Sequence, residues 1–293
     1  MKQNHDLTIN IGGRLLDFCR PWVMGILNVT SDSFFSGCRA DCCEEVRARV
    51  RAVRDEGADC IDIGACSTRP GSLPVEPGIE LKRLVEAISI VRAEWPDAVI
   101  SVDTFRASVA RRCVEAGADI INDISGGSLD PDMFAAVADL KVPYILTHMR
   151  GTPASMSSLA HYDDVVADVI TELAYRIRDL RQLGVCDIIV DPGFGFAKDV
   201  GQNYQLLASL SEICRIGLPV LVGISRKSMI CRPLGITPAE ALPATIALDS
   251  FALLQGASIL RVHDVAEAVQ ARDALLLATN PANLLTANCQ LIT

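Results

Sequence analysis

Short apolar runs rich in isoleucine and valine alternate along this chain with longer amphipathic stretches. We interpret eight of the apolar runs as strands: residues 22–28, 59–64, 99–103, 119–123, 142–147, 187–191, 219–223 and 258–262. The stretches between them carry the apolar spacing of helices, with clear examples at residues 44–56, 79–94, 162–183 and 239–255. Strands that alternate with helices in this way predict a parallel sheet covered by helices.

A glycine marks the joint between a helix and the next strand at four places. Gly57, Gly117, Gly184 and Gly256 each follow an amphipathic stretch and precede a β-branched run. Glycine commonly ends helices because it adopts the left-handed conformation without a steric penalty. The repeated joint, together with eight predicted strands, predicts an α/β fold of the TIM-type (β/α)8 class. A doubly wound open sheet is the alternative.

We expect a single barrel domain, without an internal linker, over residues 1–293. A short N-terminal β-hairpin is predicted at about residues 7–19, the barrel at about 22–279 and a tail at 280–293. The length of 293 residues suits one α/β barrel and leaves no room for a second enzyme domain. The sequence shows neither a signal peptide nor an apolar run of membrane-spanning length, so we expect a cytoplasmic protein that has no membrane partner.

Composition narrows the classes of ligand. Hydrophobic residues make up 50% of the chain and the net charge is −9, which argues against a nucleic-acid partner. An anionic substrate would therefore need a local basic pocket. The 11 cysteines include no C-x-x-C pair, so we interpret them as reduced thiols rather than as ligands of a zinc site.

Polar side chains stand where the predicted strands end. In an α/β barrel this is the end at which active sites lie. The residues at the eight ends are, in chain order, Asn28, Ser67–Gly71, Asp103, Asn122 with Asp123, His148–Arg150, Asp191, Ser225–Lys227 and Arg261–Asp264. We predict that they converge on one mouth, with three exceptions: we favour helix capping for Asp123 and Asp264 and a structural role for His148.

These polar residues divide into two kinds of chemistry. Asp103, Asn122 and Asp191 can exchange hydrogen bonds with a planar heterocycle that has amide and amidine edges. A second set is cationic and would bind an anion, most plausibly a phosphate or diphosphate; it comprises Arg69, Lys227, Arg261 and His263. The long segments Thr30–Asp41 and Ala65–Gly78, rich in Ser, Gly and Pro, are typical of lids over such a mouth, although simple surface connections are the alternative.

Eight segments, in order, resemble the signature segments of the dihydropteroate synthase family. The match runs from about Val23 to Ala271, almost the whole chain. The segments are MGILNVTSDSFFSG, IDIGACSTRPGS, ISVDTFRASVA, IINDISGG, THMRGTP, DPGFGFAK, GISRKSMI and RVHDV. One such segment would be weak evidence, whereas eight in the family's order at compatible spacing are specific.

The resemblance implies a site for each substrate. The pterin residues would be Asp103, Asn122, Asp191 and Lys227, with Met149 and Phe196 as apolar walls. The diphosphate residues would be Asn28, Thr68, Arg69, Arg261 and His263. Those for p-aminobenzoate would be Phe34, Thr68, Pro70, Ser225 and Lys227. Mg²⁺ is implied as the cofactor, bound by the diphosphate and Asn28.

The resemblance also implies the reaction. The enzyme would join 6-hydroxymethyl-7,8-dihydropterin diphosphate to p-aminobenzoate, release diphosphate and form 7,8-dihydropteroate in folate biosynthesis. Asp103, Lys227, Arg69, Arg261 and His263 would be the catalytic residues. Basic side chains would stabilise the leaving diphosphate, and Asp103 would stabilise the cationic pterin methylene. A homodimer is implied as well, and the apolar run Ala244–Leu254 suits either its interface or packing on the barrel.

Several positions depart from the family's pattern. The family's Pro, Ser-Asp, Gly-Glu, Gly, and Thr or Val are here Ser31, Phe35-Ser36, Ala65-Cys66, Ala197 and Ile224, respectively. The pterin and anion residues are intact, so we expect activity. Ser67–Gly71 carries no two-residue insertion, so we expect a target of sulfonamides.

Two other functions remain open on the sequence alone. A methyltetrahydrofolate-type methyltransferase shares a pterin-binding barrel, but would have no reason to place Arg69 and Ser225-Arg226-Lys227 against a diphosphate. A non-catalytic pterin-binding barrel is supported only by the loop departures. The presence of Asp103, Lys227 and Arg261 argues against it.

Overall fold

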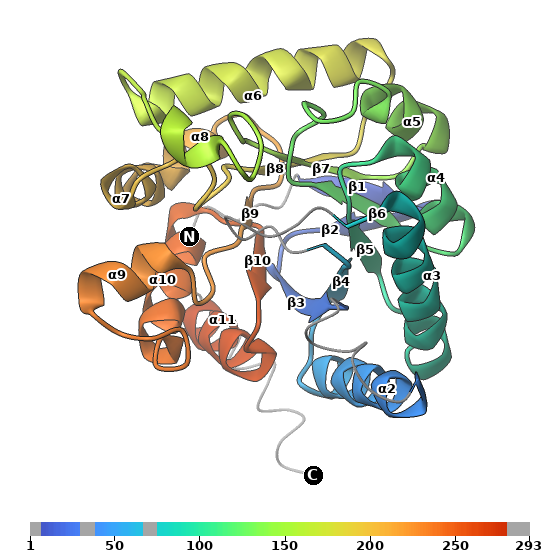
Figure 1. Ribbon diagram of the computed structural model, residues 1–293. Helices are drawn as coiled ribbons and strands as arrows, with labels where there is room; N and C mark the ends of the chain where they lie inside the picture. Colours follow the sequence, from blue (N-terminus) through green and yellow to red (C-terminus); the bar gives the residue numbers. More distant parts are fainter. Residues whose placement is uncertain (1–6, 30–38, 67–74, 280–293) are drawn as a thin grey trace.

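Eight parallel strands form a barrel surrounded by helices in the computed structural model, which describes residues 7–29, 39–66 and 75–279 (Figure 1). The strands are β3 Trp22–Asn28, β4 Cys60–Gly64, β5 Ile100–Asp103, β6 Ile120–Asp123, β7 Tyr144–Thr147, β8 Ile188–Asp191, β9 Leu221–Val222 and β10 Ile259–Val262. They fall at the eight predicted positions. Most are only four or five residues long, and nearly every residue in them is buried because the barrel interior and the helices cover both faces.

The strand order excludes the open-sheet alternative. Hydrogen-bonded neighbours run β8-β7-β6-β5-β4-β3-β10-β9. The two ends of this series meet through a parallel bridge between Val190 and Val220, and the Val190 amide donates to the Pro219 carbonyl at 2.8 Å. The sheet therefore closes on itself, as the TIM-type prediction requires.

Helices follow the strands on the outside of the barrel (Figure 1). They are α2 Arg39–Asp55, α3 Pro77–Glu94, α4 Ala107–Glu115, α5 Met133–Leu140, α6 Val165–Gln182, α7 Val200–Ala208, α8 Leu210–Cys214, α9 Ser228–Leu234, α10 Leu242–Gln255 and α11 Val265–Thr279, with a short 3₁₀ turn, η1, at Met156–Leu159. The helix predicted from residue 162 begins instead at Val165, because the Asp164 carboxylate caps it by accepting from the amides of Val166 and Ala167. In the part of the chain that the structure describes, no helix is both long and apolar enough to cross a membrane.

The predicted N-terminal hairpin closes the end of the barrel opposite the mouth. It comprises β1 Thr8–Ile11 and β2 Arg14–Asp17, joined through Gly12 and Gly13. Ile9, Ile11 and Phe18 pack with side chains at the start of the barrel strands, such as Trp22 and Ile259, in one apolar cluster. The barrel is therefore plugged at this end and can admit a ligand only at the other.

One buried ion pair ties the plugged end together. Arg272 of α11 is fully buried and donates to Asp59 Oδ2 at 2.6 Å and to the Pro21 carbonyl at 3.3 Å. Asp59 in turn accepts from the Val23 amide at 2.8 Å. These contacts join the last helix to the residues that precede β3 and β4, so they fix where the first strands enter the barrel.

Asp249 is a buried acid in α10 whose carboxylate oxygens have no hydrogen-bond donors among the described residues. Its side chain is 0% exposed, and neither carboxylate oxygen has a hydrogen-bond partner among the described residues. Burial, reinforced by the nearby charge of Asp264, raises the pKa of Asp249 to about 8. Folding near neutral pH must therefore leave a proton on Asp249, which costs free energy.

We expect Asp249→Ala and Asp249→Asn to stabilise the fold increasingly with pH. An unfolded Asp ionises near pH 4, so the folded protein holds one more proton between about pH 4 and pH 8, and its free energy of unfolding falls as pH rises through that window. Removing the acid should raise the free energy of unfolding at pH 8 by about 2 kcal/mol. Urea unfolding of variant and parent from pH 5 to pH 8 measures the difference.

Asp179→Ala, which removes a half-exposed acid on α6, is the matched control and should give no pH-dependent gain. A difference between Asp249→Asn and the parent that stays constant from pH 5 to pH 8 would contradict the proposed titration.

Candidate active site

The polar strand ends meet at the open end of the barrel, and a buried ion pair lies beneath them. The Asp62 carboxylate on β4 is 0% exposed, accepts from Arg261 Nε at 2.7 Å and forms an ion pair with Arg261 Nη2 at 2.6 Å. Arg261 stands on β10, and its Nη2 lies 3.2 Å from Asp103 Oδ2 on β5. Burial disfavours the charged guanidinium, but Asp62 and Asp103 outweigh it and raise the pKa of Arg261 above its ordinary value. Arg261 therefore stays cationic in the mouth.

Two hydrogen-bonding groups lie side by side in this mouth. Asp103 is largely buried, and that burial, partly offset by Arg261, raises its pKa to about 7. Asn122 on β6 is 3% exposed and its Nδ2 donates to Asp62 Oδ2 at 3.1 Å. Its Oδ1 has no partner within the described ranges. A buried acceptor without a partner costs free energy, so Asn122 is prepared to accept from a ligand.

Lys227 and Asp191 face one another at the next part of the mouth. Lys227 Nζ donates to the Phe194 carbonyl at 2.7 Å and lies 4.9 Å from the centre of the Phe196 ring. Burial lowers the pKa of Lys227 to about 8, and the Asp191 charge limits that fall. Burial likewise raises the pKa of Asp191, against the opposing charge of Lys227. The pair can give one donor and one acceptor to a planar ligand.

Apolar side chains flank these polar groups. Met149 and Phe196 are both buried and belong to one cluster with Ile124, Met156 and Ala197. This cluster follows β6, β7 and β8, so it lies at the open end of the barrel and is separate from the core beneath. Flat apolar walls beside a few fixed polar atoms suit a heteroaromatic ring.

Ser225 and His263 form a second polar pair beside Arg261. Ser225 Oγ lies 3.0 Å from His263 Nδ1, and the His263 amide donates to Ser225 Oγ at 3.2 Å. Burial, with the Arg261 charge, lowers the pKa of His263 to about 4, so its ring is neutral near pH 7. Ser225 and His263 can therefore act as uncharged hydrogen-bond donors to an anion that Arg261 attracts.

Arg226 does not face the mouth, which corrects the expectation that the whole Ser225–Lys227 segment meets a diphosphate. Its guanidinium pairs with both oxygens of Asp264, at 2.8 and 2.7 Å, and also donates to the Pro238 carbonyl. Its backbone is left-handed, with φ of 57°, so the side chain leaves the turn opposite to its neighbours. Arg226 instead anchors the β9 loop to the start of α11.

The two predicted helix caps serve other contacts. Asp123 accepts from the Ser125 amide and hydroxyl, the Gly127 amide and the Tyr144 hydroxyl, at 2.7 to 2.8 Å. It therefore holds the turn after β6, and helix α5 begins only at Met133, so the capping prediction for Asp123 is wrong. Asp264 does precede α11, but its carboxylate pairs with Arg226.

A buried network supports the turn that follows β8. Lys198 Nζ donates to the carbonyls of Gly193 and Phe196 and to His148 Nδ1, each at 3.0 Å. His148 Nε2 lies 3.0 Å from Glu172 Oε2, and burial lowers the pKa of His148 to about 4. Both ring nitrogens are thus occupied. No pattern in the sequence singles out Lys198, whose ammonium is buried where a lysine is seldom found.

The remaining predicted site residues take no part in the contacts described above. Asn28 ends β3 with an exposed side chain, and its Oδ1 lies near Gly64, on the strand beside Asp103. Phe34, Thr68, Arg69 and Pro70 lie outside the described residues. Across the described ranges, no three His, Cys, Asp or Glu side chains converge as metal ligands.

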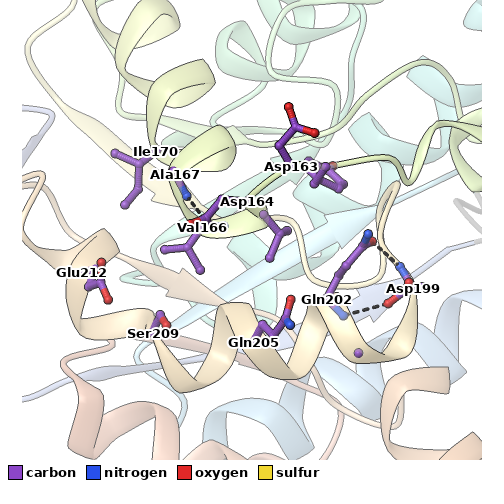
Figure 2. Close-up of a pocket in the computed structure, with 13 residues that line it drawn as sticks. Asp163, Asp164, Val166, Ala167, Ile170, Asp199, Gln202, Gln205, Ser209 and Glu212 are labelled. Atoms are coloured by element: carbon purple, nitrogen blue, oxygen red, sulfur yellow. Dashed lines mark hydrogen bonds between the residues drawn. The ribbon is translucent and has the colours of Figure 1, made fainter.

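A separate polar groove lies outside the barrel, between the start of α6 and helix α7 (Figure 2). Its volume is about 860 Å³, and it is lined by residues that include Asp163, Val166, Ile170, Gln202 and Glu212. Asp164 and Asp199 at its edge are occupied as helix caps. None of the predicted site residues lines this groove, so the strand ends remain the candidate site.

Comparison with known proteins decides the family. Residues 24–263 match the model of a family described as pterin binding enzyme. The dihydropteroate synthase of Escherichia coli K12 is 41% identical over 261 residues, which cover 88% of this chain and 92% of that enzyme. The chain belongs to the dihydropteroate synthase family. The family predicted from the eight segments is thereby confirmed.

Solved structures of the dihydropteroate synthase family share the whole architecture. The enzyme of Xanthomonas albilineans with 4-aminobenzoic acid is 41% identical, with a TM-score of 0.86 over 93% of this chain and 98% of that one. The Yersinia pestis enzyme in a sulfonamide drug complex is 39% identical, with a TM-score of 0.85 over 93% and 99%. Two Arabidopsis thaliana folate synthesis bifunctional proteins are also 41% identical, and this chain spans 58% and 52% of their length.

We expect Gly193→Ala to disrupt the site more than an ordinary left-handed glycine would. A Cβ at Gly193, whose φ is +72°, would lie 1.9 Å from the His148 carbonyl oxygen. The substitution should cost about 3 kcal/mol or more of stability, because backbone strain adds to a clash with rigid backbone. It should also weaken binding of a pterin, since the turn carries Phe194 and Phe196. Thermal unfolding and calorimetry measure the two effects.

Gly184→Ala is the matched control, because φ is +86° there but nothing lies within 4 Å of the added Cβ. It should cost only about 1–2 kcal/mol. Equal losses from the two substitutions would show that contact with His148 does not constrain the turn.

Proposed function

We propose that the protein catalyses the dihydropteroate synthase reaction. In this reaction 6-hydroxymethyl-7,8-dihydropterin diphosphate and p-aminobenzoate give 7,8-dihydropteroate and diphosphate. The observation that carries the proposal is the buried Oδ1 of Asn122, which has no partner among the described residues and lies next to Asp103 in a mouth that also holds Arg261 and Lys227. Acceptors for a guanidine-like edge and cations for a diphosphate thus stand in one pocket.

The pterin ring would occupy the space between Asp103, Asn122, Asp191 and Lys227. Asn122 Oδ1 and the Asp103 carboxylate would accept from ring N–H groups. Lys227 would donate to a ring carbonyl or nitrogen. Met149 and Phe196 would cover the faces of the ring, because both are buried in the apolar cluster at this end of the barrel. The ring would then exclude water from the carboxylates and strengthen their interactions.

The diphosphate would bind where Arg261 and His263 meet, with Asn28, Thr68 and Arg69 as further contacts. When the C–O bond breaks, the diphosphate leaves with the electron pair and positive charge develops on the pterin methylene. Arg261 stabilises the anion and Asp103 the cation, so both charges are compensated in place. The neutral arylamine then forms the C–N bond and releases a proton, for which no dedicated base is required.

Phe34, Thr68, Pro70, Ser225 and Lys227 would bind p-aminobenzoate. Ser225 lies within hydrogen-bond distance of His263, so the described part of this site adjoins the diphosphate position. A carboxylate held by Ser225 and Lys227 would fix the arylamine at the opposite end of the ring. Its nucleophilic nitrogen would then point toward the pterin methylene.

Mg²⁺ suits this site on the chemistry of its donors. Mg²⁺ keeps several waters and needs only one or two protein oxygens beside substrate phosphates. Asn28 offers an exposed amide oxygen at the mouth, close to Gly64 and the strand that carries Asp103. Bound there, the ion would neutralise charge on the leaving diphosphate.

We also propose a homodimer in the cytoplasm and a single domain over residues 1–293. Phe251 and Leu254 of α10 and Leu234 of α9 are large apolar side chains that remain exposed. Large apolar side chains exposed on these two outer helices suit contact with a second copy of the chain. The cysteines within the described residues are free thiols, which suits a reducing compartment.

The reaction is tested by diphosphate release from the pterin diphosphate. We expect release that requires both p-aminobenzoate and Mg²⁺ and that matches dihydropteroate formed. Lys227→Ala and Asp103→Asn should each lower kcat/KM by about 100-fold, because each removes a charged group that the transition state needs. Lys82→Ala, on the exposed side of α3, is the control and should leave the rate unchanged.

Other outcomes would favour the alternatives. Tight pterin binding without diphosphate release would indicate a non-catalytic pterin-binding barrel. Methyl transfer from a methylated folate to a corrinoid protein would indicate a methyltransferase. Release that is equally fast without metal would contradict the role of Asn28 and Mg²⁺.

We expect sulfamethoxazole to compete with p-aminobenzoate, as the sulfonamide complex of the Yersinia pestis enzyme suggests. The drug resembles the arylamine substrate, so it should raise the KM for p-aminobenzoate and leave kcat unchanged. Inhibition kinetics at several p-aminobenzoate concentrations measure this. An absence of inhibition at concentrations far above the KM would contradict the proposed geometry at Ser225 and Lys227.

A further inference from the structure

Asp62 is a fully buried carboxylate beneath the mouth that the proposed reaction does not use. It lies in the middle of β4, between Ile61 and Ile63, and is 0% exposed. A carboxylate in such a place is costly unless its oxygens are fully paired. Its partners therefore indicate what it does.

Three hydrogen-bond donors converge on the two oxygens of Asp62. Oδ1 accepts from Ser101 Oγ at 2.6 Å. Oδ2 accepts from Arg261 Nε at 2.7 Å and from Asn122 Nδ2 at 3.1 Å, and it forms an ion pair with Arg261 Nη2 at 2.6 Å. These partners stand on β5, β6 and β10. The Asp62 side chain therefore links β4 to three other strands of the barrel.

The contact with Asn122 sets the polarity of the pocket. An ionised carboxylate only accepts hydrogen bonds, so the carboxamide must turn its NH₂ toward Asp62. Its Oδ1 then faces away, and it is the atom that has no partner in the described part of the chain. Asn122 alone could present either end to a ligand, whereas Asn122 beside Asp62 can present only an acceptor.

The contact with Arg261 fixes the orientation of the guanidinium group. Nε donates to Asp62 at 2.7 Å, and Nη2 pairs with Asp62 at 2.6 Å and donates to Asp103 at 3.2 Å. The fixed guanidinium plane leaves Nη1 for another ligand, because the donors of arginine form a rigid fork. The same carboxylate therefore orients the group that meets the ring and the group that meets the diphosphate.

We propose that Asp62 is a positioning residue that fixes Asn122 as a hydrogen-bond acceptor and aligns Arg261 with it. The pocket thereby selects a ring that presents an N–H group at Asn122. This inference rests on the proposed function, since it takes a pterin as the ligand. Asp62 touches neither substrate and acts through its two partners.

Binding of 6-hydroxymethyl-7,8-dihydropterin, which lacks the diphosphate, tests the link to Asn122. We expect Asp62→Ala to weaken binding about tenfold in the parent, because a charge-assisted hydrogen bond is lost. In the Asn122→Ala background the same change should weaken binding by less than about threefold, since coupled residues are not additive. Equal losses in the two backgrounds would overturn the proposal.

Two further variants separate positioning from stability. Asp62→Asn keeps an acceptor oxygen for Asn122 and Arg261, so it should bind the ring better than Asp62→Ala does. Asp59→Asn weakens a similar buried contact with Arg272, but at the plugged end of the barrel. It should lower the melting temperature and leave pterin affinity within about twofold. Loss of affinity in Asp59→Asn equal to that in Asp62→Ala would indicate a general structural role and overturn the proposal.

The side-chain amide of Asn122 gives a test without ligand. In selectively labelled protein, its NH₂ resonances should shift and lose protection from solvent exchange when Asp62 becomes Ala. Unchanged resonances in a folded Asp62→Ala variant would overturn the proposal. If the parent bound no pterin, the proposed function would fail, while these resonances would still decide whether Asp62 orients Asn122.

Discussion

Closure of the barrel is the constraint on which the site depends. Asp62 and Arg261 are 199 residues apart, yet they form the ion pair beneath the mouth because β10 returns to lie beside β3, and β3 beside β4. The strands that achieve this are short, and β9 pairs over only two residues. A buried ion pair contributes little net stability by itself. The apolar core around the strands therefore stabilises the fold, and the ion pair determines the arrangement of charges within it.

The site side chains hold one another in place before any ligand arrives. Lys227 donates to the Phe194 carbonyl, and Lys198 holds the turn that carries Phe194 by donating to the carbonyls of Gly193 and Phe196. The contact with Phe194 uses one of the three donors of the Lys227 ammonium, whereas the three hydrogen bonds of Lys198 are all made within the protein. Preorganised dipoles of this kind need little rearrangement during reaction, which is how such sites lower a barrier.

The fold could be predicted because its signals are local: an apolar run, a polar strand end, a glycine at the next joint. The site was predictable where a residue ends a strand, as for Asp103 and Asp191. Asp62 was missed because all five residues of β4 are buried, so alternation along the strand does not separate the barrel interior from the helix side. Arg226 was misassigned because its left-handed backbone turns it toward Asp264, and sequence spacing does not specify that dihedral angle.

Departures from the family's pattern are accommodated by these same contacts. Ala197, where the family has glycine, has φ of 48°, a conformation that costs about 1–2 kcal/mol for a residue with a Cβ. It is buried between Phe196 and Lys198, and the three hydrogen bonds of Lys198 fix the turn in that conformation. Cys66, where the family has glutamate, lies 3.9 Å from Arg106, whose charge is instead met by the buried carboxylate of Glu80. At both positions a neighbouring side chain supports the changed residue: Lys198 holds the turn at Ala197, and Glu80 meets the charge of Arg106 beside Cys66.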